Sequence, residues 1–351
     1  MNIALVILHA DAARGGAERY TMDLAAALIR RGHGVALLAS SHADVPAGAA
    51  PVELGVSGLT RAGRYGRFLE AVSAEVSARR FDVVHAMLPI RACDVYHPHA
   101  GVAAAAQERW NIHLNPRRKR MARVERELLS GPRPPITIAL SQYVKRSIRQ
   151  HYPLADDRLV TLFNAVDLGR FQPAPQRPPR DYVNGLFVGQ DFERKGLMQA
   201  LVAASMLKEP RLKITVVGRN DGTFRPPPDA AAQVSFAGDQ PDPGRFYRDA
   251  DFLVLPTRHD PCSLVVLEAL ASGLPVISTK FNGATEIMTD GQHGYVLDDP
   301  NDVNALAAAM RKLLDPDRRA EMSQACVALR PRLSYEHHLD QLEAIYRRAR
   351  A

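Results

Sequence analysis

The chain has 351 residues, of which 46% are hydrophobic and 24% charged, and this composition excludes a disordered or low-complexity protein. Its 45 Lys and Arg residues against 38 Asp and Glu residues give a net charge of +7, which favours an anionic partner without identifying one. Three widely separated cysteines form no C-x-x-C pair, so neither a disulfide framework nor a zinc site is expected.

No targeting or membrane-spanning segment is predicted. The first apolar run, residues 3–8, is short and has no basic residues before it. No apolar stretch reaches the roughly 18 residues that a spanning helix requires. We therefore expect a cytoplasmic protein.

Short apolar runs alternate with helical patterns along the whole chain, which predicts parallel sheets built from βαβ units. The predicted strands are residues 3–8, 35–39, 82–86, 136–140 and 160–163, and then 185–189, 212–218, 234–237, 252–256 and 275–279. The proline-rich stretch 171–182 interrupts the alternation and predicts a linker. We expect an α/β protein with two doubly wound domains, 1–170 and 183–333. Helices are predicted over 302–314 and 334–351, and the last of these can pack on either domain.

Two strand-to-helix turns in the second half carry residues suited to an anionic ligand. Arg194 and Lys195 follow the strand 185–189 and are predicted at a helix start, where cations are unfavourable unless an anion binds between them. The alternative is a solvated loop. The turn after strand 252–256 contains Asp260, and Glu268 follows on a helix, where a carboxylate can accept hydrogen bonds from ribose hydroxyls or simply cap a loop. Helix-start amides that can cradle phosphate belong to Cys262, Ser263, Leu264 and Val265.

Two turns in the first half are further candidates. Gly15 and Gly16 follow the first strand, where they permit close backbone approach to a ligand or merely open a helix. His97 and His99 flank a proline before a long helical segment, so we do not expect them to be interior residues. With ordinary pKa values near 6.5 they can hydrogen-bond a sugar. No ligand cluster for a metal ion is found.

Together these residues resemble retaining glycosyltransferases of family 4, which have the GT-B architecture of two Rossmann-like domains. The stretch DPCSLVVLEALASGLPVI from Asp260 matches the family's acidic pair, although Asp260 stands where Glu is usual. Within the family, the chain is most similar to lipopolysaccharide core glucosyltransferases. The matching segments are DVY at Asp94–Tyr96, FERKG at Phe192–Gly196 and VVGRND from Val216, which includes Gly218 and Arg219.

The resemblance implies a metal-independent transfer of a hexose, with glucose favoured, from a UDP-sugar to a lipopolysaccharide-core heptose or similar glycolipid. Glu268 would bind the ribose, Arg194 and Lys195 the diphosphate, Gly15 and Gly16 the phosphate region, and Gly218 and Arg219 the nucleotide. Asp260 would contact the donor sugar. His99, with His97 as second choice, would hydrogen-bond that sugar during front-face attack. No cofactor is implied.

The resemblance also implies docking on the cytoplasmic face of the inner membrane through the basic segment 109–126. Between Glu108 and Arg133 the chain carries eight basic and three acidic residues, and Trp110 and Ile112 are available for shallow insertion. A solvated helix is the alternative. Other functions considered are transfer to another cell-surface polysaccharide, UDP-sugar epimerisation or hydrolysis, and nucleic-acid binding, which has little support without a recognisable module.

Overall fold

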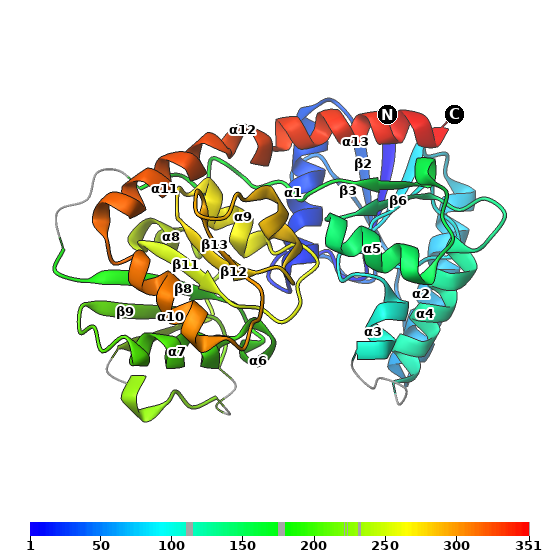
Figure 1. Ribbon diagram of the computed structural model, residues 1–351. Helices are drawn as coiled ribbons and strands as arrows, with labels where there is room; N and C mark the ends of the chain where they lie inside the picture. The colour runs from blue at the N-terminus through cyan, green and yellow to red at the C-terminus, as the bar shows by residue number, and fades with distance from the viewer. Residues whose placement is uncertain (110–114, 175–179, 221, 223, 231–232, 351) are drawn as a thin grey trace. The chain divides into compact units, whose positions relative to one another are not determined.

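The computed structural model describes residues 1–109, 115–174, 180–220, 222, 224–230 and 233–350 (Figure 1). The chain divides into two compact domains: Met1–Asn164 together with the C-terminal residues from Tyr335 on, and Ala165–Ser334. The C-terminal helix α13 (Tyr335–Arg350) therefore belongs to the first domain. Among the described residues, no helix is both long and apolar enough to cross a membrane.

The first domain is built on a parallel sheet with the strand order β3-β2-β1-β4-β5-β6-β7. Its strands are β1 (Asn2–Val6), β2 (Gly34–Ala39), β3 (Ala50–Glu53), β4 (Val83–Ala86), β5 (Val95–Tyr96), β6 (Ile136–Ala139) and β7 (Leu159–Thr161). Besides α13, its helices are α1 (Gly16–Arg30), α2 (Arg61–Ala78), α3 (Ala103–Arg109), α4 (Pro116–Leu129) and α5 (Gln142–His151).

The second domain repeats this plan with the strand order β10-β9-β8-β11-β12-β13. Its strands are β8 (Val183–Val188), β9 (Leu212–Val217), β10 (Val234–Gly238), β11 (Phe252–Leu255), β12 (Val276–Thr279) and β13 (Gly294–Leu297). Its helices are α6 (Phe192–Lys195), α7 (Leu197–Met206), α8 (Gly244–Asp249), α9 (Leu264–Ala271), α10 (Val303–Lys312), α11 (Pro316–Ala328) and α12 (Arg330–Leu333). The predicted fold class, two doubly wound parallel sheets, is confirmed.

The core follows from the sequence pattern of the strands. Every residue of β4, β6, β11 and β12 is buried, as expected for a parallel sheet covered by helices on both faces. Side-chain caps start several helices: Thr60 accepts from Gly63 N, and Asp302 accepts from Ala305 N.

The topology also shows where each sheet can bind a ligand. In each sheet the strand order reverses direction once, between β1 and β4 and between β8 and β11. Ligands of doubly wound folds bind beyond the carboxyl ends of the strands at this switch point. The turns after β8 and β11, which carry Arg194, Lys195 and Asp260, flank it in the second domain.

Candidate active site

Helix α6 is a single turn that follows β8 and brings two basic residues to the end of β11. Asp191 caps it by accepting a hydrogen bond from Arg194 N at 3.2 Å. Gly196 ends it in the left-handed region with φ 81°, and a Cβ there would lie 2.4 Å from Pro256 O. Only glycine allows this approach of the two turns.

Arg194 is fixed by three groups around its guanidinium. Its Nε donates to Asp191 Oδ2 at 2.9 Å, its Nη1 donates to His259 O at 2.8 Å, and Nη1 lies 3.9 Å from Asp260 Oδ2. Nη2 makes no hydrogen bond to the described residues, so it can still donate to an anion.

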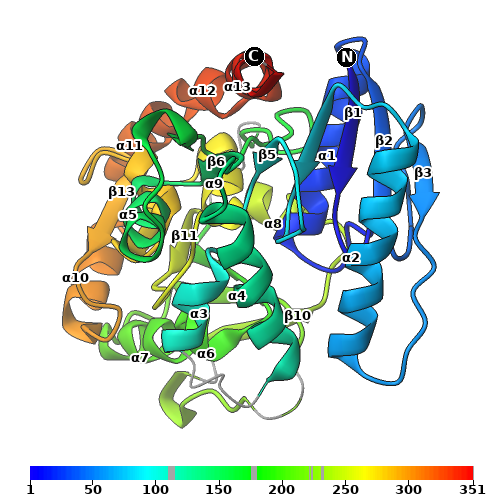
Figure 2. The same ribbon diagram turned by 90° about the vertical axis from the view of Figure 1, so that its right-hand side faces the viewer.

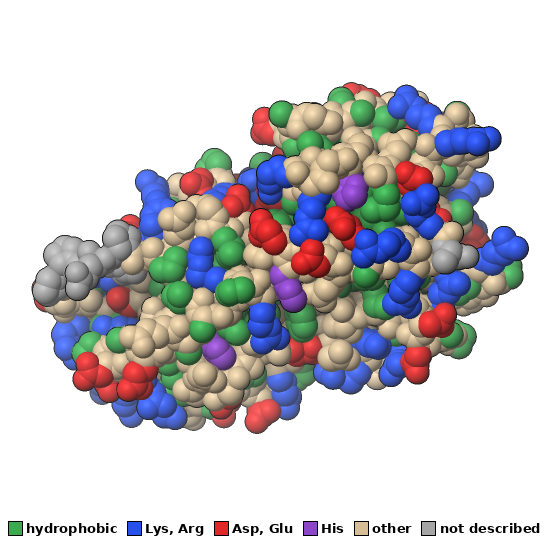
Figure 3. Space-filling model, turned by 90° about the horizontal axis from the view of Figure 1, so that it is seen from above, with side chains coloured by type: hydrophobic (Ala, Val, Ile, Leu, Met, Phe, Trp, Pro, Cys, Tyr) green, Lys and Arg blue, Asp and Glu red, His purple; other side chains and the backbone are tan. Residues whose placement is uncertain are grey.

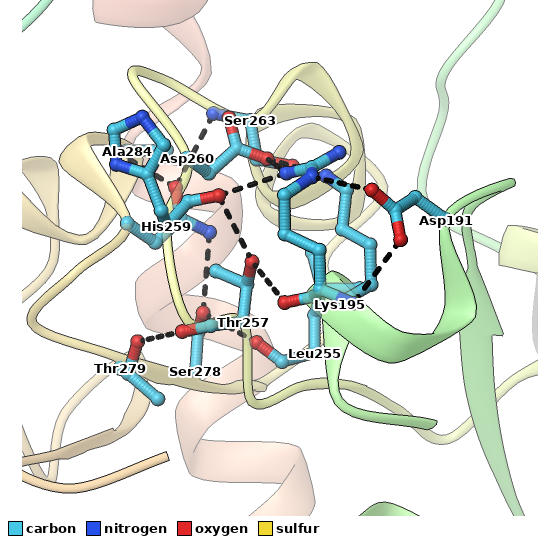
Figure 4. A network of polar contacts seen from close by, with 12 residues as sticks. Asp191, Lys195, Leu255, Thr257, His259, Asp260, Ser263, Ser278, Thr279 and Ala284 are labelled. Atoms are coloured by element: carbon cyan, nitrogen blue, oxygen red, sulfur yellow. Dashed lines mark hydrogen bonds and ion pairs between the residues drawn. The ribbon is translucent and has the colours of Figure 1, made fainter. Parts of the chain in front are cut away.

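Lys195 and Asp260 form a buried ion pair between Nζ and Oδ2, and both residues are less than 10% exposed (Figure 4). The prediction that the two basic residues lie at a helix start is therefore wrong. They end α6, and Asp191 and Asp260 already supply the compensating negative charges. Because Lys195 has three donors, the ion pair still leaves donors for a diphosphate.

The turn that carries Asp260 is held by the neighbouring turn after β12. Asp260 N donates to Phe281 O at 2.9 Å, and Asn282 Oδ1 accepts from Ser263 N and Ala284 N, each at 3.2 Å. Asn282 is fully buried and was not predicted as a site residue.

Helix α9 starts directly after this turn. Leu264 and Val265 form its first turn, whose amides have no acceptor within the helix. Cys262 and Ser263 are buried just before it, and Ser263 Oγ has no hydrogen-bond partner among the described residues. The amides of Leu264 and Val265 are thus available at this helix start, whereas the predicted amide of Ser263 already donates to Asn282 Oδ1.

Glu268 lies in the second turn of α9 and is partly exposed. Its Oε2 accepts a hydrogen bond from the hydroxyl of Tyr247 on α8 at 2.6 Å. Tyr247 is fully buried, and burial together with the Glu268 carboxylate raises the pKa of Tyr247 well above its usual value. Tyr247 therefore remains a neutral donor that orients Glu268. The sequence gives no signal for this contact, because Tyr247 precedes Glu268 by 21 positions on another helix.

Gly218 directly follows β9, which lies between β8 and β10 in the sheet. It has φ 149°, and a Cβ there would lie 1.8 Å from Gly189 O. Its amide donates to Gly238 O at 2.9 Å. The next residue, Arg219, is exposed and donates to Asp239 Oδ2 at 2.7 Å, so a nucleotide would meet an ion pair there.

In the first domain the two predicted histidines follow β5 and lie within a buried cluster. His97 is fully buried, so the expectation that it is not an interior residue is wrong. Its ring packs 4.2 Å from that of His99 and 5.4 Å from that of His85, measured between centroids. His99 is partly exposed, but its Nε2 is buried and has no hydrogen-bond partner among the described residues.

The histidines of this cluster are neutral at pH 7. Burial lowers the pKa of His85 and of His99 to about 3, and that of His338 on α13 to about 4. The predicted pKa near 6.5 is therefore wrong for His99. It can still hydrogen-bond a sugar hydroxyl, but as an uncharged imidazole.

Gly15 and Gly16 lie at the start of α1, after β1. Gly15 has φ 171°, which is extended backbone that does not require glycine. A Cβ at Gly15 would lie 3.2 Å from the Glu18 carboxylate, and burial raises the pKa of Glu18. A phosphate at this helix start would therefore lie close to a carboxylate.

Comparison with known proteins assigns both domains to glycosyltransferases. Residues 14–170 match the family model of glycosyltransferase family 4, and residues 183–316 match that of the group 1 glycosyl transferases. The chain is a glycosyltransferase of the GT-B type. It is 27% identical to a D-inositol 3-phosphate glycosyltransferase of Nocardioides sp., over 79% of this chain and 72% of the relative.

Solved structures share the fold of this glycosyltransferase at lower identity. WaaG, a glycosyltransferase involved in lipopolysaccharide biosynthesis, superimposes with a TM-score of 0.81 at 22% identity, covering 94% of this chain and 95% of that one. Anabaena Alr3699/HepE, solved in complex with UDP and glucose, gives a TM-score of 0.72 at 17% identity over 98% of both chains.

The basic segment of the glycosyltransferase is anchored to the first domain by a buried carboxylate. Glu125 on α4 is fully buried and accepts from the hydroxyls of Tyr96 at 2.6 Å and Tyr152 at 2.8 Å. In the DVY segment, Asp94 Oδ2 accepts from Val84 N at 2.7 Å. Glu125 therefore ties α4 to β5, and Asp94 adds a contact between the start of β5 and β4.

The basic side chains of α4 differ in their surroundings. Arg120 donates to Ala62 O of α2 at 2.6 Å, and burial lowers the pKa of Arg117. Exposed basic residues are Arg118, Lys119, Arg123 and Arg126. Figure 2 shows α2, α3 and α4 side by side, and the packing of α4 against both other helices agrees with this view. Trp110 and Ile112 lie outside the described residues, as does the side chain of Arg109.

The first turns of α2 and α4 differ in charge from another face of the glycosyltransferase. The surface seen in Figure 3 carries basic and acidic side chains interspersed. By comparison, the first turns of α2 and α4 contain no acidic residue, and no ion pair to an acidic residue is found there for Arg61, Arg64, Arg117 or Arg118 among the described residues. Among all the residues that the structure describes, no group of three His, Cys, Asp or Glu side chains is placed to hold a metal ion.

Proposed function

We propose that this glycosyltransferase moves a hexosyl group, with glucose as the first candidate, from a UDP-sugar to an acceptor hydroxyl with retention of configuration and without a metal ion. The observation that carries the proposal is the gathering of Arg194, Lys195 and Asp260 beside the start of α9, at the switch point of the second sheet. The HepE structures with UDP and with UDP-glucose support the choice of donor.

The leaving diphosphate would be stabilised from two sides. Arg194 Nη2 and the remaining donors of Lys195 would contact its oxygens as the glycosidic bond lengthens, and the amides of Leu264 and Val265 would add uncharged donors. Glu268, oriented by Tyr247, would accept from the ribose hydroxyls. The nucleotide would then be held before the sugar is transferred.

Front-face attack fits the state of the carboxylates in this site. The Asp260 carboxylate is engaged by Lys195, which disfavours its use as a covalent nucleophile. In our proposal Asp260 positions the donor sugar, and His99 donates or accepts a hydrogen bond as a neutral imidazole. The acceptor hydroxyl would then approach the face from which the diphosphate departs.

For the acceptor we propose an anionic glycolipid, with a lipopolysaccharide-core heptose as the first candidate. The basic residues at the starts of α2 and α4 support an anionic acceptor, and the structural similarity to WaaG favours the lipopolysaccharide core. A second candidate is a phosphorylated inositol, because the curated relatives are named D-inositol 3-phosphate glycosyltransferases. Another cell-surface polysaccharide is the remaining alternative.

Product analysis tests donor, acceptor and stereochemistry together. The full chain is incubated in EDTA with UDP-glucose, UDP-galactose or UDP-N-acetylglucosamine and with a core-heptose glycolipid or inositol 3-phosphate. We expect transfer of one α-linked hexose, seen by mass spectrometry and by the anomeric NMR signal. A β-linked product overturns retention, and loss of activity in EDTA overturns metal independence. UDP-sugar turnover without any acceptor product indicates a hydrolase or an epimerase instead.

We also propose that α4 docks on the cytoplasmic face of the inner membrane through its exposed basic residues. Replacing Arg118, Lys119, Arg123 and Arg126 by Gln removes about 1 kcal/mol of attraction per charge, so binding to vesicles with anionic lipid should fall at least about tenfold. Arg120 is left unchanged because it binds α2. The control replaces Lys208, Lys213, Arg248 and Arg311 of the second domain. Equal loss in both variants contradicts a specific role of α4.

A further inference from the structure

The histidine that is proposed to contact the donor sugar is held by its aromatic neighbours. The His99 ring lies 4.4 Å from that of Tyr20 and 4.2 Å from that of His97, with interplanar angles of 43° and 44°. Because His99 Nε2 has no hydrogen-bond partner among the described residues, no bond at this atom fixes the ring. The position of His99 therefore depends on what fixes Tyr20 and His97.

Tyr20 is fixed by a hydrogen bond to the C-terminal helix. Its ring is fully buried on α1, and its hydroxyl lies 2.7 Å from His338 Nε2 on α13. His338 Nδ1 lies 2.9 Å from Phe163 O. A carbonyl oxygen only accepts, so Nδ1 carries the proton and the neutral ring can only accept at Nε2. The Tyr20 hydroxyl must then donate, and the orientation of this three-residue chain is fully determined.

A second chain of contacts leads from α13 to His97. The Tyr346 hydroxyl lies 2.8 Å from His85 Nδ1 on β4. The His85 ring is stacked on that of His97, with 5.4 Å between centroids and 10° between the planes. Tyr346 and His85 are both fully buried. One helix at the end of the chain thus supports both neighbours of His99.

We propose that α13 sets the position of His99, and that Tyr20 and His338 are positioning residues for sugar transfer. The inference rests on the role of His99 in the proposed function. A neutral imidazole contributes to the reaction only through the direction and length of its hydrogen bonds, because it holds no charge that acts over distance. A displacement of about 1 Å in such a group can cost about 100-fold in rate.

The experiment compares Y20F, H338A and H338Q with H337A as the matched control, since His337 is the exposed neighbour of His338 on the same helix. Y20F keeps the ring and removes the hydroxyl. We expect Y20F and H338A to lower kcat about 10- to 100-fold. UDP affinity should stay unchanged, because the proposed UDP contacts lie in the second domain. H338Q keeps an acceptor for Tyr20 and should recover part of the rate, whereas H337A should behave as wild type.

Two further measurements separate positioning from a general loss of structure. In the full chain labelled with 15N-histidine, ring NMR spectra should show His338 protonated at Nδ1, and the His99 signals should shift in Y20F and H338A but not in H337A. In an H99A background, Y20F should cause no further loss of kcat. Additive losses, or His99 signals that do not move, overturn this inference alone. A wild-type rate in H99A instead overturns the proposed role of His99.

Discussion

The two domains use the same kind of topology to build two different clusters, one of charged side chains and one of neutral side chains. In the second domain, the turns after β8 and β11 bring together Arg194, Lys195, Asp191 and Asp260, which are joined by charged contacts. In the first domain, the turn after β5 lies in a cluster of histidines and tyrosines that form no ion pair among the described residues. The chemistry of the side chains, and not the fold, sets the electrostatics of each turn.

The difference matches what each half of a sugar nucleotide requires. A diphosphate gains charge as it leaves, so it is best met by cations that are already oriented. A hexose presents uncharged hydroxyls, which neutral donors and acceptors can bind without the cost of burying a charge. In our proposal the charged cluster binds the diphosphate and the neutral cluster binds the hexose. The two clusters should therefore respond differently to the removal of a charge and to acid.

The largest expected effect comes from breaking the buried ion pair of the second domain. K195M leaves the Asp260 carboxylate buried without its partner, which should cost about 3–5 kcal/mol of unfolding free energy. The double variant K195M/D260N removes both charges and should recover most of that stability. Both variants should transfer sugar at least about 100-fold more slowly, because the leaving diphosphate loses a cation. Urea unfolding and initial rates measure the two effects.

The matched control for this prediction is an exposed ion pair of the same domain. Lys280 and Asp298 are 3.0 Å apart, and their side chains are 54% and 93% exposed. K280M should cost less than about 1 kcal/mol and leave transfer unchanged. If K195M/D260N is as unstable as K195M, burial of an unpaired charge is not the cause. If K195M/D260N transfers sugar at the wild-type rate, Lys195 takes no part in the reaction.

The sequence predicted the sheets better than the contacts within the sites. All ten predicted strands are present with ends within two residues, because buried parallel strands are continuous apolar runs. Three strands were missed, and each has a weaker pattern. Strand β5 has two residues, and β13 has four and begins with a glycine. Strand β3 contains Pro51, which an edge strand tolerates. The predicted helix 302–314 is present as α10.

The partners of the site residues could not be predicted, because they are distant in sequence. His338 follows Tyr20 by 318 positions, and Lys195 precedes Asp260 by 65. Motifs indicated which residues carry charge or an imidazole, but not that Lys195 is paired or that His97 is buried. Both properties depend on which loops the topology places side by side.

The second prediction concerns acid and the first domain. The pKa values of His85, His99 and His338 are about 3, 3 and 4 in the folded protein, below the usual 6.5 of the unfolded chain. The unfolded state therefore binds protons first, and stability is present above pH 6.5 and lost as the pH falls. Each histidine contributes about 1.4 kcal/mol per pH unit between pH 6 and pH 4.

Urea unfolding of the full chain between pH 7.5 and pH 5 measures this loss. H338Q should reduce the slope of unfolding free energy against pH by about one proton, whereas H337Q should change it much less, because His337 is exposed. The comparison uses the slope of unfolding free energy against pH and not the free energy itself, because H338Q also lowers the stability at pH 7.5. Equal slopes in H338Q and wild type mean that His338 is not kept neutral by burial.

The smallest expected effect tests how Glu268 is oriented. Y247F removes the 2.6 Å hydrogen bond to the Glu268 carboxylate and keeps the buried ring. Because one hydrogen bond to a charged group contributes about 1.5–3 kcal/mol, both stability and UDP affinity should fall, the latter by about 10-fold. Y295F is the control: it removes a 2.6 Å hydrogen bond from Arg318 on another part of the same domain. Calorimetric titration with UDP should separate the two variants, because only Y247F acts on the proposed ribose contact. Similar UDP affinities of the two variants would mean that Tyr247 stabilises α9 without orienting Glu268 for the ribose.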